Sequence, residues 1–74
     1  MAHSFSGRRL RALRVAAGVS REQLAVLVDR SYGVEVRWER GFAVPNANDI
    51  GLIAHALGVD VGELYDDVPA GAVA

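Results

Sequence analysis

The chemistry that this chain can offer is concentrated in its arginines. All eight lie in residues 1–41 beside four acidic residues, whereas residues 42–74 carry five acidic residues and no lysine or arginine. A guanidinium group binds phosphate and carboxylate groups through several donors at once. The formal net charge of −1 therefore hides a basic half that suits a polyanion, so any nucleic-acid face should lie in the N-terminal half. Solvated helix faces are the alternative explanation for the same charges.

No residue pattern indicates catalysis, a metal site or a cofactor. The chain has no cysteine, so disulfides and thiolate ligands are excluded. His3 and His55 lie in no matching Ser, Asp or Glu pattern, and Asp66-Asp67 is better explained as a solvated helix end than as a metal site. No glycine-rich phosphate loop follows a strand, because the sequence predicts no strands. We therefore expect no enzyme activity, no metal and no cofactor.

Length and composition indicate one small domain. With 74 residues, 51% of them hydrophobic, the chain is near the size at which a single core is only marginally sufficient. No apolar run approaches the roughly 20 residues needed to cross a bilayer, and the first residues lack the pattern of a signal peptide. We expect a cytoplasmic protein with a structured domain over residues 1–67 and a flexible tail over residues 68–74.

The elements that position the arginines are predicted to be short helices. The first spans residues 7–17 and ends at Gly18. Ser20 begins the second with a capping box, in which its hydroxyl and the Gln23 side chain bind each other's backbone amides. The apolar residues at helical spacing in these two helices are Leu10, Leu13, Ala17, Leu24, Ala25 and Val28.

A turn at Asp29-Arg30 separates the second helix from a third. Ser31 is a typical N-cap for this third helix, over residues 32–40, and Gly41 ends it. Because Leu24-Ala25 and Trp38 are spaced to press against one another, the two helices have the layout of a helix-turn-helix.

Two further helices are predicted in the acidic half. Asn46 and Asp49 form a second capping box that opens a fourth helix, which Gly58 ends. Asp60 begins a third box and a brief fifth helix through Tyr65. The predicted core residues of the fourth helix are Ile50, Ile53, Ala54 and Leu57.

These features resemble the Cro/phage-repressor helix-turn-helix family. The resemblance covers about residues 8–65 and also includes Arg14, Trp38-Glu39-Arg40-Gly41, Pro45 and Ala54-His55-Ala56-Leu57-Gly58-Val59. It implies an all-α, λ-repressor-like five-helix bundle that binds double-stranded DNA as a homodimer. It also implies a transcriptional regulator, usually a repressor, that inserts the third helix into the major groove.

The same resemblance implies roles for individual side chains. Arg14 would form a structural ion pair with Glu39, an arrangement that can bridge two helices. Arg37 would reach a guanine edge, with a phosphate contact or a solvated charge as its alternatives. Arg21 would meet a phosphate. The DNA-binding positions that the family implies are Arg21, Ser31, Tyr32, Gly33, Val36, Arg37 and Arg40; Arg8, Arg9 and Arg11 are either phosphate contacts or solvated charges.

Four residues depart from the family pattern in the turn and the third helix: Asp29, Arg30, Gly33 and Glu35. Asp29 replaces a glycine whose backbone is often left-handed, a conformation that Asp tolerates better than most residues. Glu35 replaces a buried Ile or Val. We expect Glu35 not to be buried without a partner. Either its carboxylate reaches a neighbouring arginine, for which Arg30 is a candidate, or the third helix rotates so that Val34 or Val36 fills the core.

A protein-interaction module on the same fold is the alternative function. Glu35, the acidic C-terminal half and the apolar loop Phe42-Ala43-Val44 would suit a protein partner, as in an antitoxin or anti-repressor component. Exposed Phe42 and Val44 would equally suit self-association of a dimer on two DNA half-sites.

Overall fold

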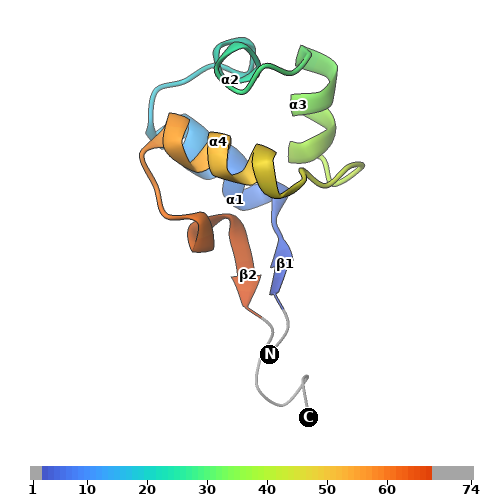
Figure 1. The fold of residues 1–74 in the computed structure, drawn as a ribbon, viewed down its shortest axis with the longest axis vertical. Coiled ribbons are helices and arrows are strands. Elements are labelled where there is room, and N and C mark those ends of the chain that lie inside the picture. Colours follow the sequence, from blue (N-terminus) through green and yellow to red (C-terminus); the bar gives the residue numbers. More distant parts are fainter. Residues whose placement is uncertain (1–2, 68–74) are drawn as a thin grey trace.

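The computed structural model describes residues 3–67, and within that range the chain forms four α-helices, one short 3-10 helix and two short strands (Figure 1). In chain order these are β1 (His3–Phe5), α1 (Gly7–Ala16), α2 (Arg21–Leu27), α3 (Tyr32–Glu39), α4 (Ala47–Leu57), η1 (Val61–Leu64) and β2 (Tyr65–Asp67). Figure 1 shows α2 and α3 at one end of the molecule and the paired strands at the other. The predicted tail, residues 68–74, lies outside the described residues.

Side-chain caps fix where the helices begin. The hydroxyls of Ser20 and Ser31 accept hydrogen bonds from backbone amides three residues ahead, at 3.0 and 3.2 Å. Asn46 caps the amide of Asp49 at 2.8 Å, and the Asp49 carboxylate accepts from the Asn46 amide at 3.2 Å. The predicted starts of α2, α3 and α4 are confirmed, because these bonds satisfy amides that no helical carbonyl reaches.

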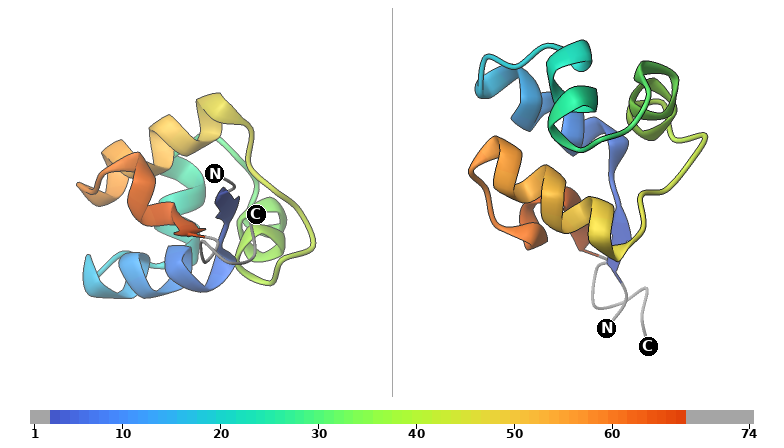
Figure 2. Two further views of the ribbon diagram at one scale, coloured as in Figure 1. Left: turned by 90° about the horizontal axis from the view of Figure 1, so that it is seen from below. Right: turned by 45° about the horizontal axis from the view of Figure 1, so that its top comes forward.

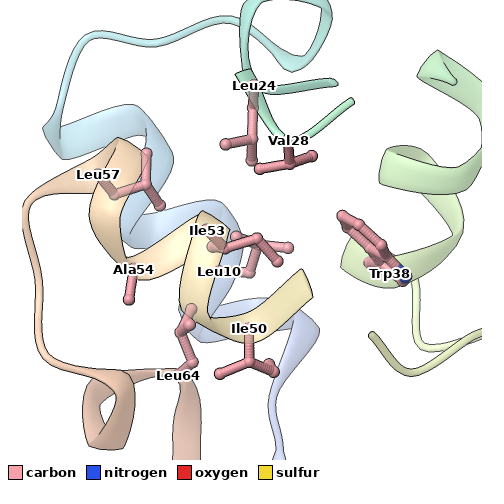
Figure 3. Close-up of a cluster of buried hydrophobic side chains, with 9 residues drawn as sticks. All are labelled: Leu10, Leu24, Val28, Trp38, Ile50, Ile53, Ala54, Leu57 and Leu64. Atoms are coloured by element: carbon pink, nitrogen blue, oxygen red, sulfur yellow. The ribbon is translucent and has the colours of Figure 1, made fainter. Parts of the chain in front are cut away.

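One apolar core joins the helices (Figure 3). Trp38 of α3 enters it with 2% of its surface exposed, and Leu64 of η1 is fully buried beneath α4. Burying one such side chain stabilises a fold by roughly 1.5–3 kcal/mol. The buried members of the cluster are Leu10, Leu24, Val28, Trp38, Ile50, Ile53, Ala54, Leu57 and Leu64.

The predictions of a fifth α-helix and of no strands are both wrong. After Asp60 the chain makes one 3-10 turn, η1, and then pairs β2 with β1 in antiparallel register, with Phe5 opposite Tyr65. The rings of this pair meet edge to face, with centroids 6.4 Å apart. The strands are three residues long, too short to show an alternating pattern, and their pairing joins the two ends of the domain.

The turn into α3 depends on Asp29. Its φ angle is +56°, the left-handed conformation that its place in the sequence suggested. α3 then runs without a break from Tyr32 to Glu39 despite Gly33, and it buries Glu35 and Trp38. The third helix has therefore not rotated to place a valine in the core.

α1 begins in close contact with the end of α3. A Cβ atom on Gly7 would lie 2.3 Å from the carbonyl oxygen of Trp38 and 2.6 Å from that of Glu39. Real side chains do not approach backbone oxygens so closely. The two helices can therefore meet only because residue 7 has no side chain.

Gly7→Ala should destabilise the domain by about 1–3 kcal/mol, the usual cost of overpacking, because the obstructing atoms are backbone and cannot rotate away. The matched control is Gly51→Ala: residue 51 lies in α4, and an added Cβ would meet no atom within 4 Å. That control should be stabilised by about 0.5–1 kcal/mol. Urea denaturation measures both variants, and a Gly7→Ala protein as stable as its parent would contradict the close contact.

Candidate nucleic-acid interface

The outward face of α3 is open to solvent. Tyr32, Gly33 and Arg37 are exposed, and Val36 is half-buried. A Cβ on Gly33 would meet nothing within 4 Å, so the backbone is accessible there. Figure 2 shows α3 at the edge of the molecule beside α2. This face combines a cation, a hydroxyl and a small apolar surface, a mixture that can contact both the edges of bases and phosphates.

The remaining predicted contact residues flank this face. Ser31 is exposed, and its hydroxyl accepts the cap hydrogen bond from Val34 at 3.2 Å. Arg40 is exposed just after α3, with its guanidinium carbon 5.4 Å from the centroid of the Phe42 ring. On α1, Arg8 and Arg11 are exposed, whereas Arg9 donates to the Asp66 carboxylate at 2.6 Å.

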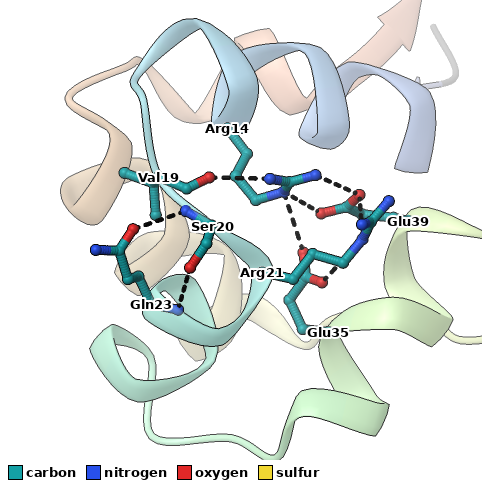
Figure 4. Close-up of polar contacts among 7 residues, drawn as sticks. All are labelled: Arg14, Val19, Ser20, Arg21, Gln23, Glu35 and Glu39. Atoms are coloured by element: carbon teal, nitrogen blue, oxygen red, sulfur yellow. Dashed lines mark hydrogen bonds and ion pairs between the residues drawn. The ribbon is translucent and has the colours of Figure 1, made fainter.

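Arg14 and Glu39 are brought together beneath α3 (Figure 4). Arg14 Nε donates to Glu39 Oε2 at 2.6 Å, and Nη2 donates to Oε1 at 3.3 Å. Arg14 Nη1 also donates to the Val19 carbonyl at 2.9 Å. Only 7% of the Arg14 side chain and 2% of the Glu39 side chain are exposed. One guanidinium thus ties α1, the α1–α2 loop and α3 together.

Arg21, implied by the family as a phosphate contact, lies against the same carboxylates. Its Nε is 3.3 Å from Glu39 Oε1 and 4.0 Å from Glu35 Oε1, and 36% of its side chain is exposed. Within the described residues, Arg37 has no such ion pair. Of these two arginines, Arg37 is therefore the one whose charge is free at the α3 surface.

The named candidates for Glu35 are wrong, although two other arginines, Arg14 and Arg21, do approach its carboxylate. The residue is fully buried, and neither carboxylate oxygen has a hydrogen-bond partner among the described residues. Arg30 does not reach it and instead donates to Asp49, at 3.0 and 2.8 Å. Val34 and Val36 do not replace it in the core, since both are only half-buried. The nearest cations to Glu35 are Arg14, at 3.9 Å, and Arg21.

Burial separates the acidities of the two glutamates. It raises the pKa of Glu35 to about 8, the Glu39 carboxylate adds to this effect, and Arg14 and Arg21 oppose it. Burial also disfavours the charged form of Glu39, but the Arg14 hydrogen bond and the neighbouring Glu35 outweigh it and lower the pKa of Glu39. The pair therefore favours one protonated and one ionised carboxyl group, as expected for two acids in one site.

Sequence reasoning missed the ion pair between Arg30 and Asp49. Asp49 was identified only as the second half of a capping box, and the Arg30 hydrogen bond, followed by that of the Asn46 amide, lowers its pKa. The pair connects the α2–α3 turn to the first turn of α4. The acidic residue at the start of α4 is a usable signal, but the sequence separation of 19 positions hides the contact.

A family model described as a helix-turn-helix domain matches residues 7–66. The restriction-modification controller protein C.AhdI from Aeromonas hydrophila is 38% identical, with a TM-score of 0.74 over 78% of this chain and 88% of that one. The clp gene regulator ClgR from Corynebacterium glutamicum is 31% identical, with a TM-score of 0.75 over 78% of this chain and 62% of that one. The P22 c2 repressor, solved in complex with a synthetic operator, is 26% identical, with a TM-score of 0.76 over 82% of this chain and 92% of that one.

No curated protein sequence matches the chain significantly. Within the part of the chain that the structure describes, no helix is both long enough and apolar enough to cross a membrane.

Arg14→Ala and Glu39→Ala should each destabilise the domain by about 2–4 kcal/mol, because each leaves a buried charge without its partner. Arg14→Ala should cost more, since it leaves two buried carboxyl groups, whereas after Glu39→Ala the Arg14 side chain still has Glu35 nearby. The double variant should cost much less than the sum of the two. Chemical denaturation of all four proteins measures the coupling, and additive effects below 1 kcal/mol would argue against a buried pair.

The free energy of unfolding should fall between about pH 5 and pH 8. The pKa of Glu35 is about 8 in the folded protein and roughly 4.3 when unfolded. The folded state therefore holds the proton more tightly, and this stabilisation is lost as the pH rises through that window. Glu35→Gln should remove this part of the pH dependence. Identical stability profiles for the two proteins would contradict a protonated Glu35.

Proposed function

The chain belongs to the helix-turn-helix domain family, and from this premise we propose that it is a repressor-type transcriptional regulator that binds double-stranded DNA by sequence, with α3 in the major groove. Its structural relatives include a restriction-modification controller, a gene regulator and a repressor, and this similarity supports the proposed function. The P22 c2 repressor was solved with a synthetic operator, so the same fold is seen bound to DNA. In this proposal the protein acts by binding DNA and needs neither catalysis nor a cofactor.

The observation that carries the proposal is the exposed face of α3. Tyr32, Gly33 and Arg37 lie on it, and the bulk of Trp38 is turned the other way into the core. The missing side chain at Gly33 would allow the helix backbone to approach the bases closely. Arg37, one turn later, would then reach the O6 and N7 atoms of a guanine.

The flanking residues would fix the domain on the DNA backbone. Arg21 begins α2, Ser31 caps the start of α3 and Arg40 follows its end, and we assign all three to phosphates. Val36 would contact a thymine methyl group beside Arg37.

We further propose a homodimer, because a symmetric operator presents two half-sites. Phe42 and Val44 follow α3 and are 67% and 74% exposed, so they offer apolar surface for self-association. The proposed binding domain spans residues 1–67, with residues 68–74 as a tail. We also propose that it acts in the cytoplasm.

A protein-interaction module, such as an antitoxin or anti-repressor component, is the second candidate. The same exposed Phe42 and Val44 favour it, since apolar residues with this exposure can bind a protein partner. Salt separates the two candidates: binding through arginine–phosphate contacts weakens steeply with salt, whereas apolar docking does not.

The purified protein should bind duplexes selected from a random DNA pool. If each protomer neutralises roughly four to six phosphates, the logarithm of affinity should fall with the logarithm of salt concentration at a slope of about 0.9 per phosphate. Fluorescence anisotropy across a salt series measures this slope. Failure to bind any duplex at low salt, or a flat salt response, would reject the proposed function.

Arg37→Ala should weaken binding to the selected site by about 1–3 kcal/mol and relax the preference at one base pair in each half-site. Arg40→Ala is the matched control: it removes an exposed arginine nearby and should weaken all sequences alike. Competition between selected and random duplexes distinguishes these effects. Equal losses on both duplexes for Arg37→Ala would make Arg37 a phosphate contact, with the reading residue elsewhere on α3.

A further inference from the structure

Glu35 is a buried acidic side chain. Neither apolar packing nor contact with DNA explains why an acidic residue occupies this position. It points inward from α3, opposite to the proposed reading face, and within the described residues its carboxylate oxygens accept no hydrogen bond. A buried carboxylate without close partners is costly. The charged residues around Glu35 should therefore determine whether its carboxyl group is protonated or ionised.

Of the two arginines next to this carboxylate, Arg21 is the less firmly held. Arg14 is already held by two hydrogen bonds to Glu39 and one to Val19. Among the ion pairs of residues 3–67, Arg21 has the 3.3 Å contact with Glu39 and the 4.0 Å contact with Glu35, and about a third of its side chain reaches solvent. Figure 4 shows it extending from α2 toward both glutamates.

The charge on the cluster depends on one proton. With both glutamates ionised, Arg14, Arg21, Glu35 and Glu39 sum to zero. With Glu35 protonated the cluster carries +1, and Arg21 is attracted only to Glu39, whose carboxylate already binds Arg14. Protonation therefore weakens the hold on Arg21 and makes the surface more attractive to a phosphate.

The charged groups around Glu35 come from each element packed against α3. Arg14 faces it from α1, Arg21 from α2 and Glu39 from α3 itself, while Glu22 of α2 acts on Arg14. Arg30 in the turn is directed to Asp49 instead. Burial, with Glu39, brings the pKa of Glu35 to about 8, so the proton is exchanged within an experimentally accessible range.

We propose that Glu35 is a positioning residue for Arg21: when ionised it holds the guanidinium on the α1–α3 cluster, and when protonated it releases Arg21 to a DNA phosphate, so that DNA affinity rises as the pH falls. This rests on the proposed function, in which Arg21 is a phosphate contact. By linkage, DNA binding must in turn favour proton uptake by Glu35.

The test measures affinity for the selected duplex from pH 6 to pH 9 at fixed salt, for the parent, Glu35→Gln, Arg21→Gln and the double variant. One linked proton changes affinity by up to about tenfold per pH unit. The parent should lose at least about threefold more affinity between pH 7 and pH 9 than Glu35→Gln, which controls for every other titrating group. In the Arg21→Gln background this difference should vanish.

Equal pH profiles for the parent and Glu35→Gln would overturn the proposed role of Glu35 but not the proposed DNA-binding function. If none of the four proteins binds the duplex, both proposals are overturned. A difference that persists without Arg21 also overturns the proposed role of Glu35, because Glu35 would then act through another group. Carbon-13 NMR titration of the Glu35 carboxyl in the parent, free and bound to the duplex, needs no variant. A higher pKa in the complex supports the inference, and an equal or lower one overturns it.

Discussion

The orientation of α3 depends on the buried contact between Arg14 and Glu39. α3 is only eight residues long and contributes one large apolar side chain, Trp38, to the core. A single apolar anchor does not fix the rotation of a helix, whereas a guanidinium with two directed bonds to a carboxylate does. Because Arg14 also binds the Val19 carbonyl, the same group sets the path of the loop that leads into α2.

Two further contacts complete this support. The start of α1 lies against the last carbonyls of α3 through Gly7, and Arg30 joins the α2–α3 turn to Asp49 at the start of α4. α3 is thus held from its buried side and near both ends. Tyr32 and Arg37 on its outer face are exposed and are not part of these supporting contacts. This face is therefore available for the proposed recognition of DNA.

Among the buried charged residues that the structure describes, Glu35 is the one whose carboxylate oxygens have no hydrogen-bond partner. It occupies a core position of α3, where an apolar side chain would stabilise the domain at lower cost. Residues that oppose stability in this way are expected at functional positions. Here the opposing residue lies 4.0 Å from Arg21, which is one of the proposed phosphate contacts.

The sequence by itself determined the starts of α2, α3 and α4 and most of the apolar residues of the core, although Ala17 is exposed and Leu64 was not expected there. These follow from capping chemistry and helical spacing, which act over a few residues. The pairing of Arg14 with Glu39 was suggested through family resemblance rather than spacing. Only the tertiary structure decided how the other charged residues pair. From the sequence alone Arg30 could pair with Glu35 or Asp49, and the positions of the helices in space select Asp49. The tertiary structure likewise decided the β1–β2 pair, since strands of three residues are stable only where distant segments meet and satisfy each other's backbone groups.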